Sequence, residues 1–163
     1  MENVVTPKQK TTPRDFFLHL LSIVMLYASA IAFSTLLFQY INLFIPDLVE
    51  GGYWSIDHAR AVGRGALATL IVVFPIYVWI NWFLNQDYLK NPEKRELRIR
   101  KWLIYLTLFI TAIIIIVDLV ALVRNFLDGE LTTRFLLKVL TIGFVAGSIF
   151  WYYLTDIKKN KTE

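Results

Sequence analysis

Four long apolar segments, at roughly 16–45, 61–84, 102–127 and 135–154, account for most of this chain of 163 residues. Each is at least as long as the ~20 residues that an α-helix needs to cross a hydrocarbon core. Short polar segments join them and leave no room for a separate soluble domain. We therefore predict an all-α fold, a four-helix transmembrane bundle. A single domain over 1–163 would contain spans at about 16–45, 59–85, 102–127 and 133–155, between polar cytoplasmic tails at 1–14 and 156–163.

Composition supports a membrane protein, because 56% of the residues are hydrophobic and 15% are aromatic. These fractions exceed those of an ordinary soluble domain. The chain has no cysteine. Disulfides, thiolate nucleophiles, iron–sulfur clusters and cysteine-ligated zinc are therefore excluded.

Basic residues are concentrated on one side of the predicted membrane. In multi-pass proteins, Lys and Arg residues of short loops are retained in the cytoplasm. The two tails and the loop between the second and third spans contain Lys8, Lys10, Arg14, Lys90, Lys94, Arg95, Arg98, Arg100, Lys101, Lys158, Lys159 and Lys161. We therefore expect both termini to be cytoplasmic and the protein to lie in the cell (plasma or inner) membrane.

The start of the chain also resembles a secretory signal peptide. A basic segment precedes an apolar run from Phe16 to Tyr27, and the small residues Ala28, Ser29 and Ala30 follow it. The apolar pattern continues to Ile45, however, as a membrane span does. We expect the first segment to be retained.

Each predicted span has a polar residue near its outer end. Counted at 1.5 Å per residue, Gln39, Arg64, Asp118 and Lys138 lie roughly 8 to 14 Å below the outer surface. Three further basic residues near that end are Arg60, Arg124 and Arg134. A charged side chain that faces lipid costs on the order of 2 to 3 kcal/mol or more. We therefore expect these side chains to turn inward and meet.

Two interpretations of this cluster remain open. It can be an outward-facing site for an anion, a lipid phosphate or a carboxylate, with Arg64 and Lys138 as ligands and Asp118 as counter-ion. It can instead be a buried ion-pair network that fixes the helix register. Polar residues at helical spacing indicate the inward stripes of the last two spans. The expected stripes are Thr107, Thr111, Asp118, Ala121 and Asn125 in the third span, and Arg134, Lys138, Thr141, Ser148 and Tyr152 in the fourth.

Other residues predict how the helices bend and begin. Pro75 removes a backbone hydrogen bond in the second span and is a candidate hinge. Gly143 and Gly147 form a small-xxx-small pair that permits close helix packing. The sequence Asn91-Pro92-Glu93 resembles a helix start, so we expect a charged cytoplasmic helix that runs straight into the third span.

No motif for catalysis or cofactor binding is present. His19 and His58 lie near opposite membrane faces, so they cannot ligate one haem, and neither has neighbours for a zinc site. There is no Ser-His-Asp order, phosphate-binding loop or pair of intramembrane carboxylates. We expect a non-enzymatic protein with no cofactor, no metal and no catalytic residue.

Several segments together resemble a family of small four-span bacterial integral membrane proteins that is defined only as a domain of unknown function. They are Arg14-Asp15-Phe16-Phe17, Leu36-Leu37-Phe38-Gln39, Pro92-Glu93-Lys94-Arg95, the stretch from Trp102 to Phe109, Asp118-Leu119 and the stretch from Gly129 to Lys138. The resemblance covers nearly the whole chain and implies the four-span fold without an activity. At His19, the resemblance implies an aromatic residue instead.

These observations favour an accessory or scaffold protein that binds lipids or partners, with the Arg, Asp and Lys cluster near the outer face. The alternative is a small oligomeric transporter or channel for an anion or a proton-coupled solute that uses the same cluster. Expected partners are membrane lipids and either a second copy or another membrane protein; nucleic acid is not expected. A polar path from Thr141 through Ser148 would support conduction, whereas an apolar plug of Leu26, Ile71 and Ile114 would argue against it.

Overall fold

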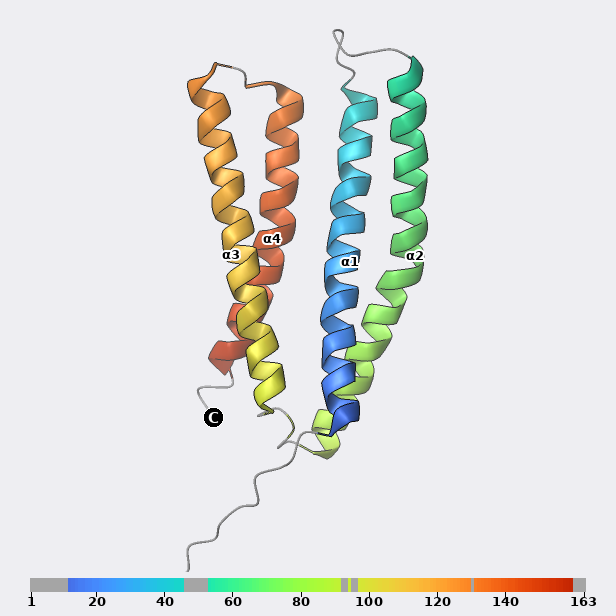
Figure 1. Ribbon diagram of the computed structural model, residues 1–163, viewed down its shortest axis with the longest axis vertical. Helices are drawn as coiled ribbons and strands as arrows, with labels where there is room; N and C mark the ends of the chain where they lie inside the picture. The colour runs from blue at the N-terminus through green and yellow to red at the C-terminus, as the bar shows by residue number, and fades with distance from the viewer. Residues whose placement is uncertain (1–11, 46–52, 92–93, 95–96, 130, 160–163) are drawn as a thin grey trace, which may run out of the picture.

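The computed structural model describes residues 12–45, 53–91, 94, 97–129 and 131–159. These residues form four helices and no strand (Figure 1). The helices are α1 (Pro13–Phe44), α2 (Tyr53–Lys90), α3 (Arg98–Leu127) and α4 (Thr133–Lys159). Each is long and apolar enough to cross a membrane. The predicted all-α fold with four candidate spans is confirmed.

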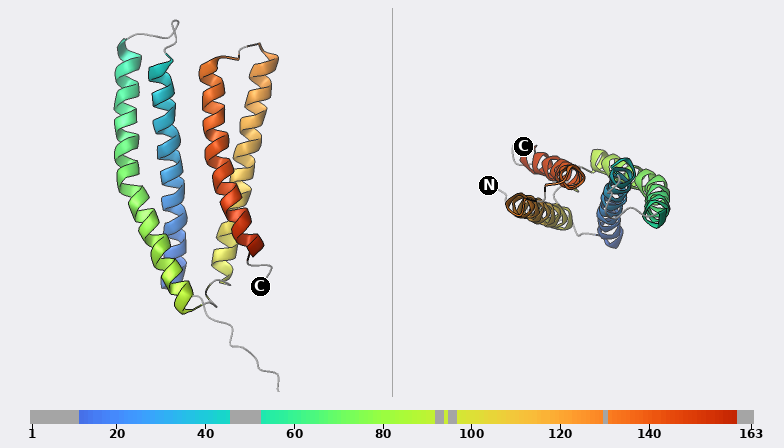
Figure 2. Two further views of the ribbon diagram at one scale, coloured as in Figure 1. Left: turned by 180° about the vertical axis from the view of Figure 1, so that it is seen from behind. Right: turned by 90° about the horizontal axis from the view of Figure 1, so that it is seen from above.

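The four helices form two antiparallel pairs that meet along α1. Helix α1 packs against α2, and α3 packs against α4 (Figures 1 and 2). Helix α1 also contacts α4 and α3, whereas no Cα atom in the described part of α2 lies within 8 Å of one in α3 or α4. We call the end where α1 begins and α4 ends the termini end, and the opposite end the loop end.

Helix α2 continues through Pro75 and bends near its middle (Figure 2). Proline lacks the amide hydrogen of a regular helix turn, and its ring displaces the preceding carbonyl, so a bend is expected there. Beyond the bend, α2 crosses α1 toward the side on which α3 and α4 lie (Figure 1). The second half of α2 therefore faces the α3–α4 pair at the termini end.

The helix faces that point inward match the prediction for α3 but not for all of α4. Thr107, Thr111 and Asp118 are buried in α3, as expected from their spacing. In α4, Ser148 and Tyr152 are exposed, and the buried residues include Val139, Ala146 and Tyr153. The predicted α4 stripe is therefore wrong toward the termini end. The Ser148 hydroxyl donates to the Phe144 carbonyl of its own helix at 2.7 Å, so it needs no inward partner.

The membrane-facing surface is apolar on all four helices. Large exposed side chains include Val24, Ile31, Ile71, Trp79, Phe109, Val117, Leu140 and Phe144. In water such surfaces would associate, but in a bilayer they are solvated by lipid tails. This surface and the length of the helices indicate a multi-pass membrane protein.

Helix α1 begins at a capping residue, and α3 begins after a residue with an extended backbone. Thr12 caps α1, because its hydroxyl oxygen accepts from the Asp15 amide at 3.3 Å. Leu97 has an extended backbone (φ −54°, ψ 128°), and α3 starts at Arg98. The expected helix from Asn91 straight into the third span is therefore wrong at Leu97; its residues 92, 93, 95 and 96 lie outside the described residues.

Candidate functional site at the termini end

The charged residues expected near the outer face are distributed over separate parts of the bundle. Arg64 is an exposed residue of α2 and lines a groove with Gln39 of α1. Asp118 is buried in α3, and its Oδ2 atom lies 3.6 Å from the position that a Cβ atom on Gly143 of α4 would occupy. No ion pair joins Arg64 to Asp118 among the described residues, and no Cα atom in the described part of α2 lies within 8 Å of one in α3.

The other four basic residues of this group make local contacts. Arg60 lies 3.7 Å from Asp57, and Arg124 lies 3.8 Å from Asp128, both on exposed helix surfaces. Arg134 donates to the Asn42 carbonyl at 3.1 Å, and Lys138 Nζ lies 5.9 Å from the centre of the Phe38 ring. These contacts join α4 to α1 but do not complete a shared layer with Arg64.

The two glycines of α4 have different surroundings. Gly143 faces Asp118 across the α3–α4 contact, whereas a Cβ atom on Gly147 would meet nothing within 4 Å among the described residues. Gly147 lies in a shallow surface depression with Phe144 and Trp151. Among the described residues, α4 therefore approaches another helix closely at Gly143 but not at Gly147.

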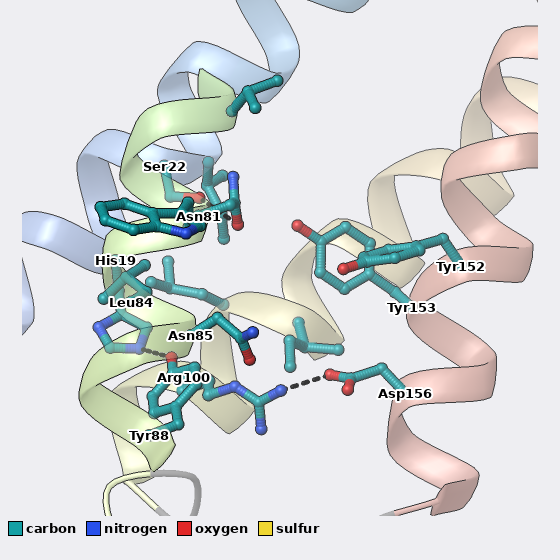
Figure 3. Close-up of a pocket in the computed structure, with 15 residues that line it drawn as sticks. His19, Ser22, Asn81, Leu84, Asn85, Tyr88, Arg100, Tyr152, Tyr153 and Asp156 are labelled. Carbon is teal, nitrogen blue, oxygen red and sulfur yellow. Dashed lines mark hydrogen bonds and ion pairs between the residues drawn. The ribbon is translucent and has the colours of Figure 1, made fainter. Parts of the chain in front are cut away.

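At the termini end, all four helices line a cavity of about 720 Å³ (Figure 3). This volume lies within the range of roughly 300 to 1,000 Å³ that is usual for small-molecule sites. Its polar lining comes from every helix: His19 and Ser22 of α1; Asn81, Asn85 and Tyr88 of α2; Arg100 of α3; and Tyr152, Tyr153 and Asp156 of α4. The bend of α2 places its three polar residues opposite α4.

His19 and Tyr88 connect α1 to α2 at the inner wall of the cavity. His19 is buried, and its Nδ1 lies 2.7 Å from the Asp15 carbonyl oxygen. A carbonyl oxygen can only accept, so Nδ1 carries hydrogen. In the neutral ring, Nε2 therefore accepts from the Tyr88 hydroxyl, and the structure pairs these two atoms (Figure 3). Both ring nitrogens of His19 therefore have hydrogen-bond partners within the protein.

Lys94 joins the beginning of α1 to the end of α2 just below this histidine. Its Nζ lies 2.7 Å from Asp87 Oδ2 and 3.3 Å from Asp15 Oδ1. The hydrogen bond to Asp87 raises the pKa of Lys94 above its ordinary value, and the contact with Asp15 acts in the same direction. We call these three residues the Lys94 bridge. The bridge links α1 to α2, the two helices that form this wall of the cavity.

Arg100 contacts two helices across the cavity. Its guanidinium lies 2.6 Å from Asp156 Oδ2 of α4 and 5.3 Å from the centre of the Tyr88 ring of α2. The Arg100 side chain is 14% exposed and the Asp156 side chain is 31% exposed. The pair is therefore partly desolvated, and it is the charged group of the cavity lining.

Several polar groups that face the cavity have no hydrogen-bond partner among the described residues. These are the Asn85 side-chain amide and the hydroxyl groups of Tyr152 and Tyr153. Tyr153 is only 8% exposed. The close-up shows both tyrosine hydroxyls directed toward α2 across the open space (Figure 3). Polar groups that line an open cavity in this way can form hydrogen bonds to a bound polar molecule.

The cavity opens sideways between α2 and α4. No Cα atom in the described part of α2 lies within 8 Å of one in α4. Trp82 of α2 is 58% exposed and Tyr152 of α4 is 62% exposed, and both line the cavity. Val78 and Ile23 provide apolar lining farther from the helix ends. The opening therefore faces the lipid, with polar groups near the helix ends and apolar groups deeper in the bundle.

The cluster residues predicted from the sequence lie toward the loop end and do not line this cavity. From the sequence, Arg100 belongs to the cytoplasmic basic flank and Asp156 to the C-terminal tail. A usable signal was present in the second span, where Asn81, Asn85 and Tyr88 recur at i, i+4 and i+7 on one helix face.

Comparison with known proteins identifies the family but not an activity. No curated protein and no solved structure is significantly similar to the chain. Residues 15–153 match a domain of unknown function, DUF5671. The match includes Asp15, His19, Lys94 and Arg100 as well as Tyr153, and it ends three residues before Asp156. Because it covers most of the chain, the expected resemblance is confirmed, and this protein belongs to the DUF5671 family.

Proposed function

We propose that this protein is a non-enzymatic accessory protein of the bacterial cell membrane that binds a membrane lipid in the termini-end cavity. The observation that supports this most strongly is the sideways opening between α2 and α4, which leads from the membrane-facing surface to unpartnered polar groups. A molecule that enters there needs an apolar part in the lipid and a polar part near the helix ends. A membrane lipid has this shape.

The depth of the polar groups supports the same proposal. Arg100 is the third residue of α3, and Asp156 lies three residues before the end of α4. At 1.5 Å per residue, both lie within about 5 Å of a helix end. That is the level of lipid headgroups.

Orientation is a separate part of the proposal. The excess of Lys and Arg at the termini end favours a cytoplasmic location for both termini, so the cavity would face the inner leaflet. Single-cysteine labelling tests this directly, because the chain has no native cysteine. We expect Asp128→Cys to react with an impermeant maleimide in intact cells and Lys101→Cys to react only after permeabilisation. The reverse pattern would contradict the orientation.

We do not extend the proposal to a transporter. That alternative needs the charged residues near the outer face to form one layer, and Arg64 and Asp118 lie on helices with no pair of described Cα atoms within 8 Å. The lipid site requires only the termini-end cavity.

Native mass spectrometry of protein released from lipid nanodiscs tests lipid binding. The wild type should retain one phospholipid. Asn85→Trp should lose most of that lipid, because the larger side chain occupies the cavity mouth. Ile71→Trp is the matched control, since Ile71 is a 63% exposed residue on the same helix and does not line the cavity. Equal retention by both variants and the wild type would overturn the proposal.

A further inference from the structure

We propose that the termini-end cavity selects a phospholipid whose headgroup is zwitterionic, with a phosphate and an ammonium group. This inference deepens the proposed lipid-binding function and rests on it. It comes from the pairing of Arg100 with Asp156 at the polar end of the cavity.

Among the described residues, the cavity lining contains one positive and one negative side chain. Arg100 and Asp156 are 2.6 Å apart, and His19 is neutral when it accepts from Tyr88. The described part of the lining therefore has no net charge. A cavity of this kind has no general preference for anions, unlike a cluster of Lys and Arg residues.

An anionic headgroup fits this pair poorly. Its phosphate would compete for Arg100 and leave the Asp156 carboxylate without its cation, next to another negative charge. A partly buried charge that loses its partner carries a large desolvation cost. A cationic headgroup fits poorly for the same reason, because it would pair with Asp156 and leave the Arg100 guanidinium without its anion.

A zwitterionic headgroup replaces one ion pair by two. Its phosphate can accept from the Arg100 guanidinium, and its ammonium can donate to the Asp156 carboxylate. Both protein charges keep a partner, so the exchange avoids the penalty that excludes the other headgroups. The Asn85 amide and the Tyr153 hydroxyl then supply neutral hydrogen bonds to the remaining phosphate or ester oxygens.

Aromatic rings next to Asp156 favour the ammonium end. Tyr152 and Tyr153 form an edge-to-face pair with ring centres 5.1 Å apart, and both line the cavity beside Asp156 (Figure 3). Cations bind favourably to the faces of aromatic rings. The acyl chains would leave between α2 and α4 along Val78, which is 48% exposed. Phosphoethanolamine and phosphocholine headgroups share this chemistry.

Competition in nanodiscs tests this inference. The membranes contain equal parts of phosphatidylethanolamine, phosphatidylcholine and phosphatidylglycerol, and native mass spectrometry identifies the retained lipid. The wild type should retain the two zwitterionic lipids over phosphatidylglycerol by about tenfold, the factor that corresponds to ~1.4 kcal/mol. Asp156→Asn should reverse the preference toward phosphatidylglycerol, because Arg100 then lacks its counter-ion. The ratio of the two zwitterionic lipids shows whether the ammonium must be primary.

Two further variants make the outcome unambiguous. The double variant Arg100→Gln, Asp156→Asn removes both charges and should abolish the preference without reversing it, even if Asp156→Asn alone unfolds. Asp128→Asn is the matched control, since this exposed carboxylate pairs with Arg124 at the loop end. Retention of phosphatidylglycerol by the wild type at least equal to that of the zwitterionic lipids would overturn the inference. Retention of no lipid at all would instead overturn the proposed function.

Discussion

The hydroxyl of Tyr88 donates a hydrogen bond to Nε2 of His19, a contact between residues that are 69 positions apart in the chain. It joins the first turns of α1 to the last turns of α2 and forms the inner wall of the cavity. His19 is 6% exposed, so the loss of its partner would leave a buried acceptor unsatisfied.

Tyr88→Phe should lower the free energy of unfolding by about 1 to 2 kcal/mol, because the buried Nε2 loses its donor. His19→Phe should also destabilise the protein. The double variant should be less destabilised than the sum of the single variants, since neither polar group then remains without its partner. Thermal unfolding in detergent measures these changes. Tyr105→Phe, at a 53% exposed position of α3, is the control; strict additivity would contradict the contact.

The Lys94 bridge predicts a specific loss of stability at high pH. Its contacts, first with Asp87, hold the pKa of Lys94 above its unfolded value of about 10.4. Stabilisation by the bridge is therefore fully present below pH ~10.4 and is lost as the pH rises through the folded-state pKa. Lys94→Arg, which stays protonated, should lose less stability between pH 9 and 11.5 (roughly one unit on either side of that value). Lys101→Arg is the control, and a wild-type-like profile for Lys94→Arg would contradict the prediction.

The stability of an Asp118 variant tests whether this carboxylate is part of an ion pair. The described residues provide it with no ion pair, and Gly143 faces it across the α3–α4 contact. We therefore expect Asp118→Asn to leave the melting temperature unchanged or to raise it, because it removes a charge that is costly to bury. A loss of about 3 to 5 kcal/mol, the usual result of breaking a buried ion pair, would show that Asp118 has a partner.

Pro75 should control the position of the second half of α2. Pro75→Ala restores an amide hydrogen that can bond to the Ile71 carbonyl, so the helix should straighten and move away from α4. Spin labels at Leu89→Cys and Lys158→Cys should then give a longer distance by pulsed electron paramagnetic resonance. A label pair at Lys101→Cys and Lys158→Cys, which reports on α3 and α4, should not change. An unchanged distance for the first pair would contradict a role of Pro75 in shaping the cavity.

The overall fold was predictable because its signal is local. Uninterrupted apolar runs specify transmembrane helices, and the spacing of Thr107, Thr111 and Asp118 identified the inner face of α3. The same reasoning was wrong for Ser148 and Tyr152. A serine hydroxyl can bond to a carbonyl of its own helix, so it can face lipid, and a tyrosine near a helix end can lie at the membrane interface.

The candidate site was less predictable because it depends on which helices are neighbours. Counting residues from the helix ends gives the depth of Arg64 and Asp118 but not the side of the bundle on which each lies. Helix α2 packs against α1, so its residues at the loop end do not reach α3. At the termini end, the bend of α2 brings Tyr88 close to Arg100, and this tertiary contact has no sequence signal of its own.

The most direct test of the lipid site is a phosphorus-to-nitrogen contact measured by solid-state NMR. The protein is labelled with ¹⁵N-arginine in phosphatidylethanolamine bilayers, and Arg100→Gln assigns the signal of interest. We predict strong ³¹P dephasing of the Arg100 guanidinium nitrogens, which should disappear in Asn85→Trp and persist in Ile71→Trp. An Arg100 signal without ³¹P dephasing in the wild type would show that no phosphate occupies the cavity and would contradict the account.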